Sequence, residues 1–320
     1  LLLWFAFSLP SPLFDSPYST VLEDRNGVFL SARIAPDYQW RFPGTDSVPL
    51  KFATALRYFE DEYFYYHPGI NPVSMVRALL QNIRSERVVS GGSTLSMQVI
   101  RMSRQHKRRD IFTKLYEMIL AIRLEAGYSK DEILSLYASH APFGGNVVGL
   151  DAAAWRYYGR PASRLSWGES AALAVLPNAP ALVFPGKNHE VYLRKRNRLI
   201  DKLAENKIID STTCQLAKAE PLPGKPTALP QLAPHLLTKL MQEVTAGKTI
   251  RSTLDVQIQQ KTVQIAQRYG RYYAGNYIHN AAIVVMNTKT GDVLAYAGNI
   301  NLDDRNNAPY VDNAIANRSS

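Results

Sequence analysis

The sequence predicts a mainly α-helical domain that is preceded by a short β-hairpin and followed by part of an α/β domain. Three observations support this. Apolar residues recur at helical spacing from about residue 49 to residue 206, a proline-rich stretch follows at residues 221–234, and strand-like segments lie beyond it. Because 320 residues are enough for two domains, we expect a linker at residues 216–250.

The first nine residues are apolar and stop at Pro10. A helix of this length rises roughly 13 Å against about 30 Å of hydrocarbon, so it cannot span a membrane alone. We expect residues 1–9 to be the end of a truncated transmembrane anchor; a signal-peptide remnant and an exposed apolar strand are the alternatives. Residues 10–48 then hold a juxtamembrane linker, rich in Ser and Pro, and a hairpin over Val21–Ile34 that turns at Asn26-Gly27.

Residues 49–215 contain the helical segments. Two apolar sets recur at helical spacing: Val73, Val76, Leu79, Leu80 and Ile83, and then Ile111, Phe112, Leu115, Ile119 and Ile122. Ser129 and Glu132 form a capping-box pattern, and the helix that they open ends before Pro142. Another apolar helix is expected over Leu165–Leu176.

Residues 251–320 combine helix and strand signals. A helix is expected from Val256 to about Tyr269, followed by a hairpin of buried strands over residues 281–297 with its turn at Thr290–Asp292. This turn contains the triplet Lys289-Thr290-Gly291, which is also found in penicillin-interacting enzymes. Their Ser-x-x-Lys and Ser-x-Asn motifs do not occur in these 320 residues, so we interpret the triplet as a hairpin turn only.

The formal net charge is +10, which favours an acidic partner such as anionic lipid, a phosphorylated substrate or nucleic acid. Nucleic acid is the weakest of these because no recognised binding motif accompanies the charge. The single cysteine, Cys214, excludes an internal disulfide and a cysteine-based metal cluster. A reducing compartment and a bacterial periplasm both remain open.

Glu60 is the first candidate for chemistry. It ends an apolar helical run and lies among aromatic residues, where partial burial is expected to raise its pKa and make it a usable proton acceptor. The alternative is an acidic cluster at a helix end, exposed to solvent.

Gly92-Ser93-Thr94 is the second candidate. These residues present backbone N–H groups and hydroxyls at the start of a basic helix, which suits phosphate or sugar oxygens. The alternative is a helix cap without a ligand. Farther on, Lys114 and Glu117 are three residues apart and share a helical face, where a surface ion pair would be worth about 0.3 kcal/mol.

Taken in order, these motifs resemble the peptidoglycan glycosyltransferase domain of class A penicillin-binding proteins. The resemblance spans roughly residues 20–210 and comprises five ordered motifs. Met97, Thr113 and Ser139 stand where the family usually has Gln, Arg and Asn, and these departures make the chain most similar to the 1C branch of the family.

The resemblance implies a lysozyme-like fold for residues 49–215 and roles for individual residues. Glu60 is the expected general base on the acceptor hydroxyl. Glu117 is the second acidic group, which either orients Lys114 and Arg109 or coordinates a divalent cation. The residues expected to bind or position substrate are Asp61, His67, Gly92, Ser93, Thr94, Gln98, Arg101, Arg109 and Lys114, with His67 as a residue that shapes the site.

By the same resemblance, the chain polymerises lipid II into glycan strands, with inversion and release of undecaprenyl diphosphate. Its expected location is the bacterial inner membrane, with one N-terminal anchor and the catalytic part in the periplasm. Lipid II, the growing strand, the membrane and other cell-wall synthesis proteins are the expected partners. No cofactor is required by the resemblance, and Mg²⁺ or Mn²⁺ is an optional one.

Two other functions fit parts of the pattern. A glycan-cleaving enzyme also uses one acidic residue in a lysozyme-like groove, although it needs no cations for a leaving diphosphate. A glycan- or lipid-binding scaffold with decayed catalysis would tolerate the unusual motif residues. Residues 251–320 resemble the opening of a transpeptidase domain, so this chain alone is expected to lack transpeptidase activity and acylation by penicillin.

Overall fold

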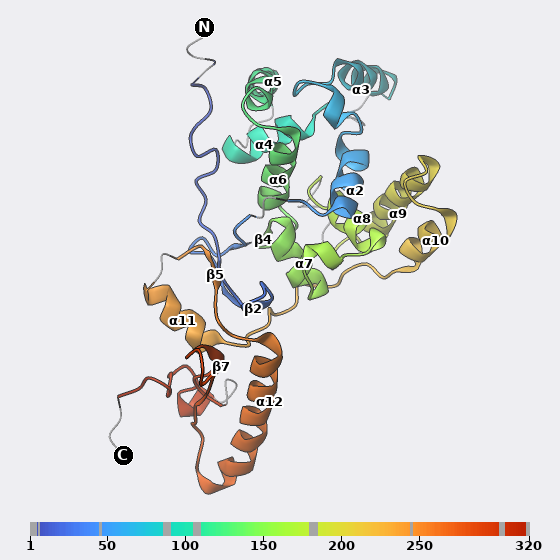
Figure 1. Cartoon of the computed structure of the whole chain (residues 1–320). Coiled ribbons are helices and arrows are strands. Elements are labelled where there is room, and N and C mark those ends of the chain that lie inside the picture. Colours follow the sequence, from blue (N-terminus) through green and yellow to red (C-terminus); the bar gives the residue numbers. More distant parts are fainter. Residues whose placement is uncertain are drawn as a thin grey trace. The chain divides into compact units, whose positions relative to one another are not determined.

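The computed structural model describes residues 5, 7–44, 47–85, 91–104, 110–178, 185–243, 246–300 and 305–317. The chain divides into two compact units (Figure 1). Unit 1 consists of residues 1–16 and 44–227, and unit 2 consists of residues 17–43 and 228–320. Residues 1–4 and 6 of the expected anchor lie outside the described residues, so the anchor stays a prediction.

Unit 1 is mostly helical. Its elements are α2 (Leu50–Glu60), η1 (Phe64–Tyr66), α3 (Pro72–Arg84), α4 (Leu95–Arg104), α5 (Ile111–Glu125), α6 (Lys130–His140), β4 (Val147–Val148), α7 (Leu150–Tyr158), η2 (Ala162–Arg164), α8 (Trp167–Val175), α9 (His189–Glu205) and α10 (Ser211–Ala219). Helix α8 is central, because every residue from Gly168 to Val175 is buried. A helix that is apolar on all sides must be covered on all sides, and α2, α9 and α10 pack against it.

Local signals define the helix ends in unit 1. The capping box of Ser129 and Glu132 is confirmed at the start of α6. The apolar helix predicted over Leu165–Leu176 is α8, which Ser166 and Glu169 open with a second capping box.

Two helices of unit 1 turn their apolar sides to the surface. On α3, Val73, Val76, Leu80 and Ile83 are exposed, and on α5 the same is true of Phe112, Leu115, Ile119 and Ile122. The predicted helical spacing is therefore confirmed, but these residues do not form the core. Both helices lie at the upper end of unit 1 in Figure 1. Among the described residues, no helix is both long and apolar enough to cross a bilayer.

Unit 2 is built around a small mixed sheet. Its elements are β1 (Thr20–Glu23), β2 (Phe29–Arg33), β3 (Trp40–Arg41), α11 (Pro234–Glu243), β5 (Thr249–Arg251), α12 (Val256–Tyr273), η3 (Ala274–Asn276), β6 (Ile283–Met286), β7 (Val293–Ala297) and η4 (Arg305–Asn307). The predicted hairpin is β1–β2, and its turn is closed by Asp24 Oδ1, which accepts the N–H groups of Asn26 and Val28.

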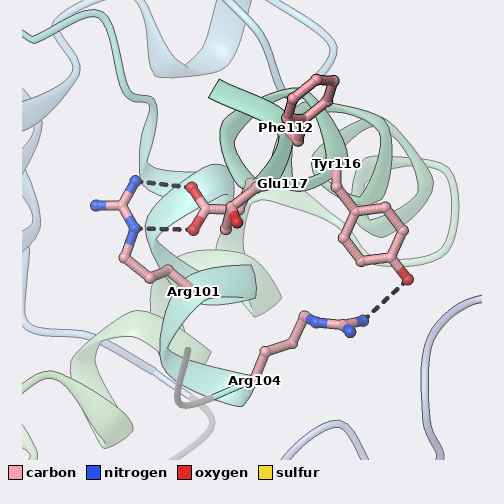
Figure 2. A pocket seen from close by; sticks show the side chains of 6 residues that line it. Arg101, Arg104, Phe112, Tyr116 and Glu117 are labelled. Atoms are coloured by element: carbon pink, nitrogen blue, oxygen red, sulfur yellow. Dashed lines mark hydrogen bonds and ion pairs between the residues drawn. The ribbon is translucent and has the colours of Figure 1, made fainter. Parts of the chain in front are cut away.

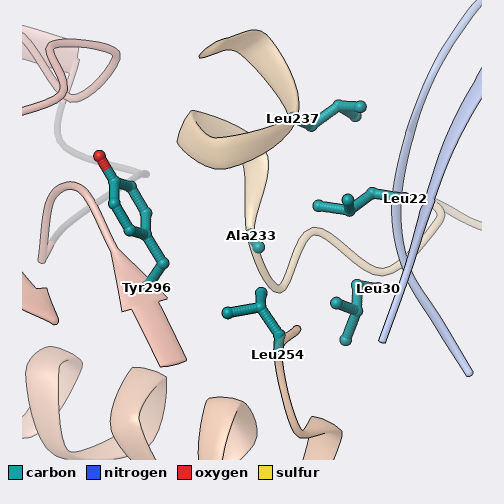
Figure 3. Packing of buried hydrophobic residues seen from close by; sticks show 6 residues of the cluster. All are labelled: Leu22, Leu30, Ala233, Leu237, Leu254 and Tyr296. Atoms are coloured by element: carbon teal, nitrogen blue, oxygen red, sulfur yellow. The ribbon is translucent and has the colours of Figure 1, made fainter. Parts of the chain in front are cut away.

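The hairpin does not stand apart from the later sequence. Strand β1 also pairs in parallel with β5, so the sheet order is β2–β1–β5. Figure 3 shows the core that covers this sheet, in which Leu22 and Leu30 face Leu237 and Leu254. The hairpin is thus part of unit 2, although about 200 residues separate it from its partners.

The second predicted hairpin is β6–β7, an antiparallel pair. Lys289 and Thr290 lie in its turn, where Asn287 Oδ1 accepts their N–H groups, and Gly291 has a φ of +77°. The prediction of buried strands is wrong for β6, whose residues alternate between partly buried and exposed.

Gly69 sets the approach of two helices in unit 1. Its φ is +91°, and a Cβ at this position would lie 2.6 Å from the carbonyl oxygen of Ala121. Its own carbonyl accepts the hydroxyl of Thr94 at 2.6 Å. We expect Gly69→Ala to destabilise the protein by roughly 2–4 kcal/mol, because strain and overlap add.

Gly145→Ala is the matched control in urea unfolding. Gly145 also has a positive φ, of +56°, but its Cβ would meet open space. Backbone strain alone costs about 1–2 kcal/mol there. Equal losses in the two variants would show that the contact with Ala121 does not matter.

Candidate active site

Glu60 is the last residue of α2, and its side chain is partly exposed. Its Oε2 accepts a hydrogen bond from Nε2 of Gln98 on α4 at 2.7 Å, and its Oε1 accepts one from Nδ2 of Asn178, beyond the end of α8, at 3.3 Å. Neutral amides from two other segments therefore hold both carboxylate oxygens. Since each oxygen has two lone pairs, the carboxylate can still take a proton.

Burial and neighbouring groups shift the pKa of Glu60 upward. Burial is the main cause that raises the pKa of this carboxyl, and the charge of Asp61 adds to the rise. The hydrogen bonds from Gln98 and Asn178 and the charge of Lys195 act in the opposite direction. Because the net shift is upward, the carboxylate is a stronger base than an ordinary glutamate.

Asp61 and His67 are buried and bind each other. Nε2 of His67 lies 3.0 Å from both carboxylate oxygens of Asp61, and Asp61 Oδ2 also accepts the N–H of Leu95 at 3.0 Å. These contacts fasten the start of α4 to the segment after α2. They support the interpretation of His67 as a residue that shapes the site, and they give Asp61 a similar role.

The Gly-Ser-Thr segment divides between two roles. The buried Thr94 hydroxyl donates to Gly69 and accepts the N–H of Met97 at 3.2 Å, so it is used as a helix cap. Ser93 and Thr94 both line a polar cavity of about 90 Å³ together with Glu60 and Lys202, but only Thr94 uses its hydroxyl as a helix cap. Gly92 also lines it, and a Cβ there would lie 2.7 Å from Cα of Met75. Ser93 therefore remains the best candidate of this segment for contact with substrate.

Arg101 on α4 and Glu117 on α5 form a two-pronged ion pair (Figure 2). Arg101 Nε lies 3.0 Å from Glu117 Oε1, and Nη2 lies 2.8 Å from Oε2. The hydrogen bond with Glu117 raises the pKa of Arg101, and the charge of Glu60 contributes to the rise. Gln98, which donates to Glu60, lies three residues before Arg101 on α4, so both side chains share one face of this helix.

A cavity of about 280 Å³ lies over this ion pair. It is lined by Arg101, Arg104, Phe112, Thr113, Tyr116 and Glu117. Arg104 is held by the hydroxyl of Tyr116 at 3.1 Å (Figure 2). The cavity thus combines two cations with aromatic walls, a combination suited to an anionic group attached to an apolar chain.

The predicted cation cluster is only partly assembled. Lys114 is exposed on α5 and does not line the cavity of Arg101 and Glu117. Arg109 lies outside the described residues. Glu117 binds Arg101, a residue 16 positions away, which spacing along one helix could not indicate.

The departures from the family pattern differ in importance. Met97 is fully buried, so it belongs to the core of unit 1 and does not replace a contact in the site. Ser139 packs against Gly44 and Gly149. Thr113 is the exception, since it lines the cavity at Arg101.

Two residues near Glu60 were missed in the sequence. Asn178 donates to Glu60, and its Oδ1 accepts from Nζ of Lys195 on α9 at 3.1 Å. Asn178 follows Pro177 and looks like part of a helix stop, while Lys195 looks like one of several basic residues on a helix. Only the packing of α2 and α9 on α8 brings them to the carboxylate.

Within the described part of the chain, no group of three or more His, Cys, Asp or Glu side chains could hold a metal ion. Both oxygens of Glu117 are engaged by Arg101. A divalent cation therefore has no preformed protein cage there, although Mg²⁺ often binds through one or two carboxylates and the phosphates of a substrate.

Comparisons with known proteins identify the family of this chain. A family model described as transglycosylase matches residues 31–204. Penicillin-binding protein 1C of Escherichia coli is 34% identical over 312 residues, which are 97% of this chain and 40% of that protein. Penicillin-binding protein 1A of Aquifex aeolicus is 35% identical over 180 residues, which are 56% of this chain and 25% of that protein.

The crystal structure of penicillin-binding protein 1A from Haemophilus influenzae covers 80% of this chain and 29% of that chain, at 18% identity. The TM-score of this match is 0.37. The chain spans less than half the length of each of these relatives.

Proposed function

The chain belongs to the transglycosylase family, and from this membership we propose that it is a peptidoglycan glycosyltransferase that polymerises lipid II into glycan strands. The predicted resemblance to class A penicillin-binding proteins is confirmed by the relatives that match it. One observation carries the proposal: α4 holds both Gln98, which donates to Glu60, and, one turn further on, Arg101, which lines a cavity together with Arg104. A glycan-cleaving enzyme would not need this second feature.

In the proposed reaction Glu60 removes the proton from the acceptor hydroxyl. The resulting oxygen attacks the anomeric carbon of the donor from the side opposite the leaving group, so the configuration is inverted. The bond to undecaprenyl diphosphate breaks, and this diphosphate departs with the electron pair. Gln98 and Asn178 hold the carboxylate for this step with hydrogen bonds to different oxygens.

Arg101 stabilises the negative charge that develops on the leaving diphosphate. Glu117 fixes the guanidinium through two bonds and leaves it partly exposed on the side of the cavity. Arg104 lines the same cavity and adds a second charge. Arg109 and Lys114 are proposed to contribute further positive charge to the binding of the diphosphate. A divalent cation beside the diphosphate is an optional addition to this set.

We place the enzyme at the bacterial inner membrane with its catalytic part in the periplasm. The exposed apolar sides of α3 and α5 support this placement, since such surfaces bind the boundary between lipid headgroups and tails. An N-terminal anchor and guidance of the lipid tails by these helices belong to the same proposal. Residues 251–320 are proposed to open a transpeptidase domain, which would make the full protein bifunctional.

Replacing both Val76 and Leu80 on α3 by Glu is expected to weaken binding to vesicles of anionic phospholipid. These side chains are 57% and 50% exposed. Because each side chain is already about half buried, covering the exposed parts of both contributes roughly 1.5–3 kcal/mol, so we expect at least a tenfold loss in a flotation assay. Leu216→Glu on α10 is the control, because Leu216 is equally apolar and 65% exposed. Equal losses of vesicle binding in both variants would show that α3 is not the surface that binds the membrane.

The direct test of the proposed function is turnover of labelled lipid II by the chain in detergent, with glycan strands resolved by length. We expect polymer and released undecaprenyl diphosphate. The same assay with EDTA, and then with added Mg²⁺ or Mn²⁺, tests whether a cation is needed. Cleavage of purified glycan without polymerisation of lipid II would contradict the proposal.

A further inference from the structure

A hydrogen-bonded chain connects Lys195 to the candidate base. Lys195 Nζ donates to Asn178 Oδ1 at 3.1 Å, and Asn178 Nδ2 donates to Glu60 Oε1 at 3.3 Å. The three residues come from α9, from the segment after α8 and from the end of α2. Helices α2, α8 and α9 pack on one another, which brings the three residues together.

The donor and acceptor groups of these three side chains fix the direction of the two hydrogen bonds. A lysine ammonium can only donate hydrogen bonds, so it requires the carbonyl oxygen of Asn178 on its side. The NH₂ group of the same amide must then face Glu60. Without Lys195 the amide could rotate by half a turn and present its oxygen to the carboxylate, which would replace attraction by repulsion.

We propose that Lys195 is a positioning residue for Glu60, and that it acts through Asn178 by holding this amide in the orientation that binds the carboxylate. The inference rests on the proposed function, in which Glu60 is the base. It predicts that Lys195, on a basic helix, affects a reaction that its side chain does not touch.

Other charged and titratable groups also face Glu60. They include Asp61, Arg101 on α4 and Tyr137 on α6. Helix α9 contributes Lys202 in addition to Lys195, and Lys202 lines the same polar cavity as Glu60. Lys202 is paired with Glu62 at 2.7 Å. Of these two lysines, Lys195 is the one whose charge lowers the pKa of Glu60. Its loss should therefore raise the pKa of the base further.

The test is the pH dependence of kcat/KM for lipid II in the chain carrying Lys195→Met, Lys195→Arg or Asn178→Ala. For Lys195→Met we expect a loss of about 10- to 100-fold at neutral pH, mostly in kcat, because a displaced base is costly. The acid limb of the profile should move to higher pH. Lys195→Arg keeps the charge and the donor and should restore most of the activity.

Lys207→Met is the matched control, since Lys207 is exposed just after α9. The double variant of Lys195→Met and Asn178→Ala should lose no more activity than the worse single variant, because both residues act through the same two hydrogen bonds. Circular dichroism and thermal melting are the controls that test whether each variant is folded. If Lys195→Met fails to fold, Asn178→Ala alone tests the kcat loss and the shifted acid limb.

The outcomes separate the two proposals. An unmodified chain that does not polymerise lipid II overturns the proposed function, and this inference with it. An active chain in which Lys195→Met leaves the acid limb in place overturns the inference alone. A loss confined to KM also overturns it, because Lys195 would then bind substrate directly.

Discussion

Glu60→Gln is expected to lower kcat/KM for lipid II by about 10²–10⁴-fold, the contribution typical of a general base. The amide has the size of the carboxyl and can still bind Gln98 or Asn178, so the pocket should keep its shape. It cannot take the proton of the acceptor hydroxyl. The measurement is the initial rate of polymer formation from labelled lipid II.

Glu205→Gln is the matched control for this variant, because Glu205 is an exposed carboxylate at the end of α9. It should polymerise at the rate of the unmodified chain. If Glu60→Gln retained more than about a tenth of the activity, a loss below the usual range for a lost base, Glu60 would not be the base.

The pH dependence follows from the raised pKa of Glu60. The unmodified chain should gain activity as pH rises through this pKa, above the range of an ordinary glutamate. Stability should change in the other direction. A carboxyl with a raised pKa in the folded state contributes stability that is present below its unfolded pKa and is lost as pH rises through the folded pKa. Glu60→Gln should therefore melt no lower than the unmodified chain, with a difference that grows towards neutral pH.

The helices of unit 1 could be predicted because their signals are local. The capping box of Ser129 and Glu132 can be recognised from one helical turn, and the apolar spacing of α3 from one helix face. The direction in which α3 turns its apolar side depends on its neighbours, and sequence spacing does not contain that information. The pairing of β1 with β5 was missed for a related reason, since Val21 pairs with Thr249 and residues 44–227 of unit 1 lie between them in the sequence.

The candidate site shows the same limit at the level of side chains. Glu60 was identified from its aromatic neighbours and from the family motif. The contacts of Asn178 with Glu60 and Lys195 come from the packing of three helices. An asparagine after a helix and a lysine on a basic helix are both common, so neither residue type pointed to the site. Met97 looked like a change in the site because it stands where the family usually has Gln, but adjacent helical residues point in different directions, and Met97 points into the core.

Arg101→Met is expected to reduce kcat by about 10²–10³-fold, because a preorganised cation on a developing charge contributes this much. The same change leaves Glu117 buried without its partner. Because Arg101 is about one third exposed, we expect a loss of only roughly 1–3 kcal/mol in the free energy of unfolding, below the cost of breaking a fully buried pair. Lipid II turnover and urea unfolding measure the two effects, and Lys207→Met controls for the loss of one positive charge.

A second variant separates the two roles of Arg101. Adding Glu117→Leu to Arg101→Met removes the unpaired buried charge and puts an apolar side chain of similar size in its place, which should restore most of the stability. Activity should stay low, because no cation has returned to the cavity. If activity recovered together with stability, Arg101 would serve only to neutralise Glu117, and another residue would have to stabilise the leaving diphosphate. If stability recovered alone, the exposed side of Arg101 would be the part of the site that the reaction requires.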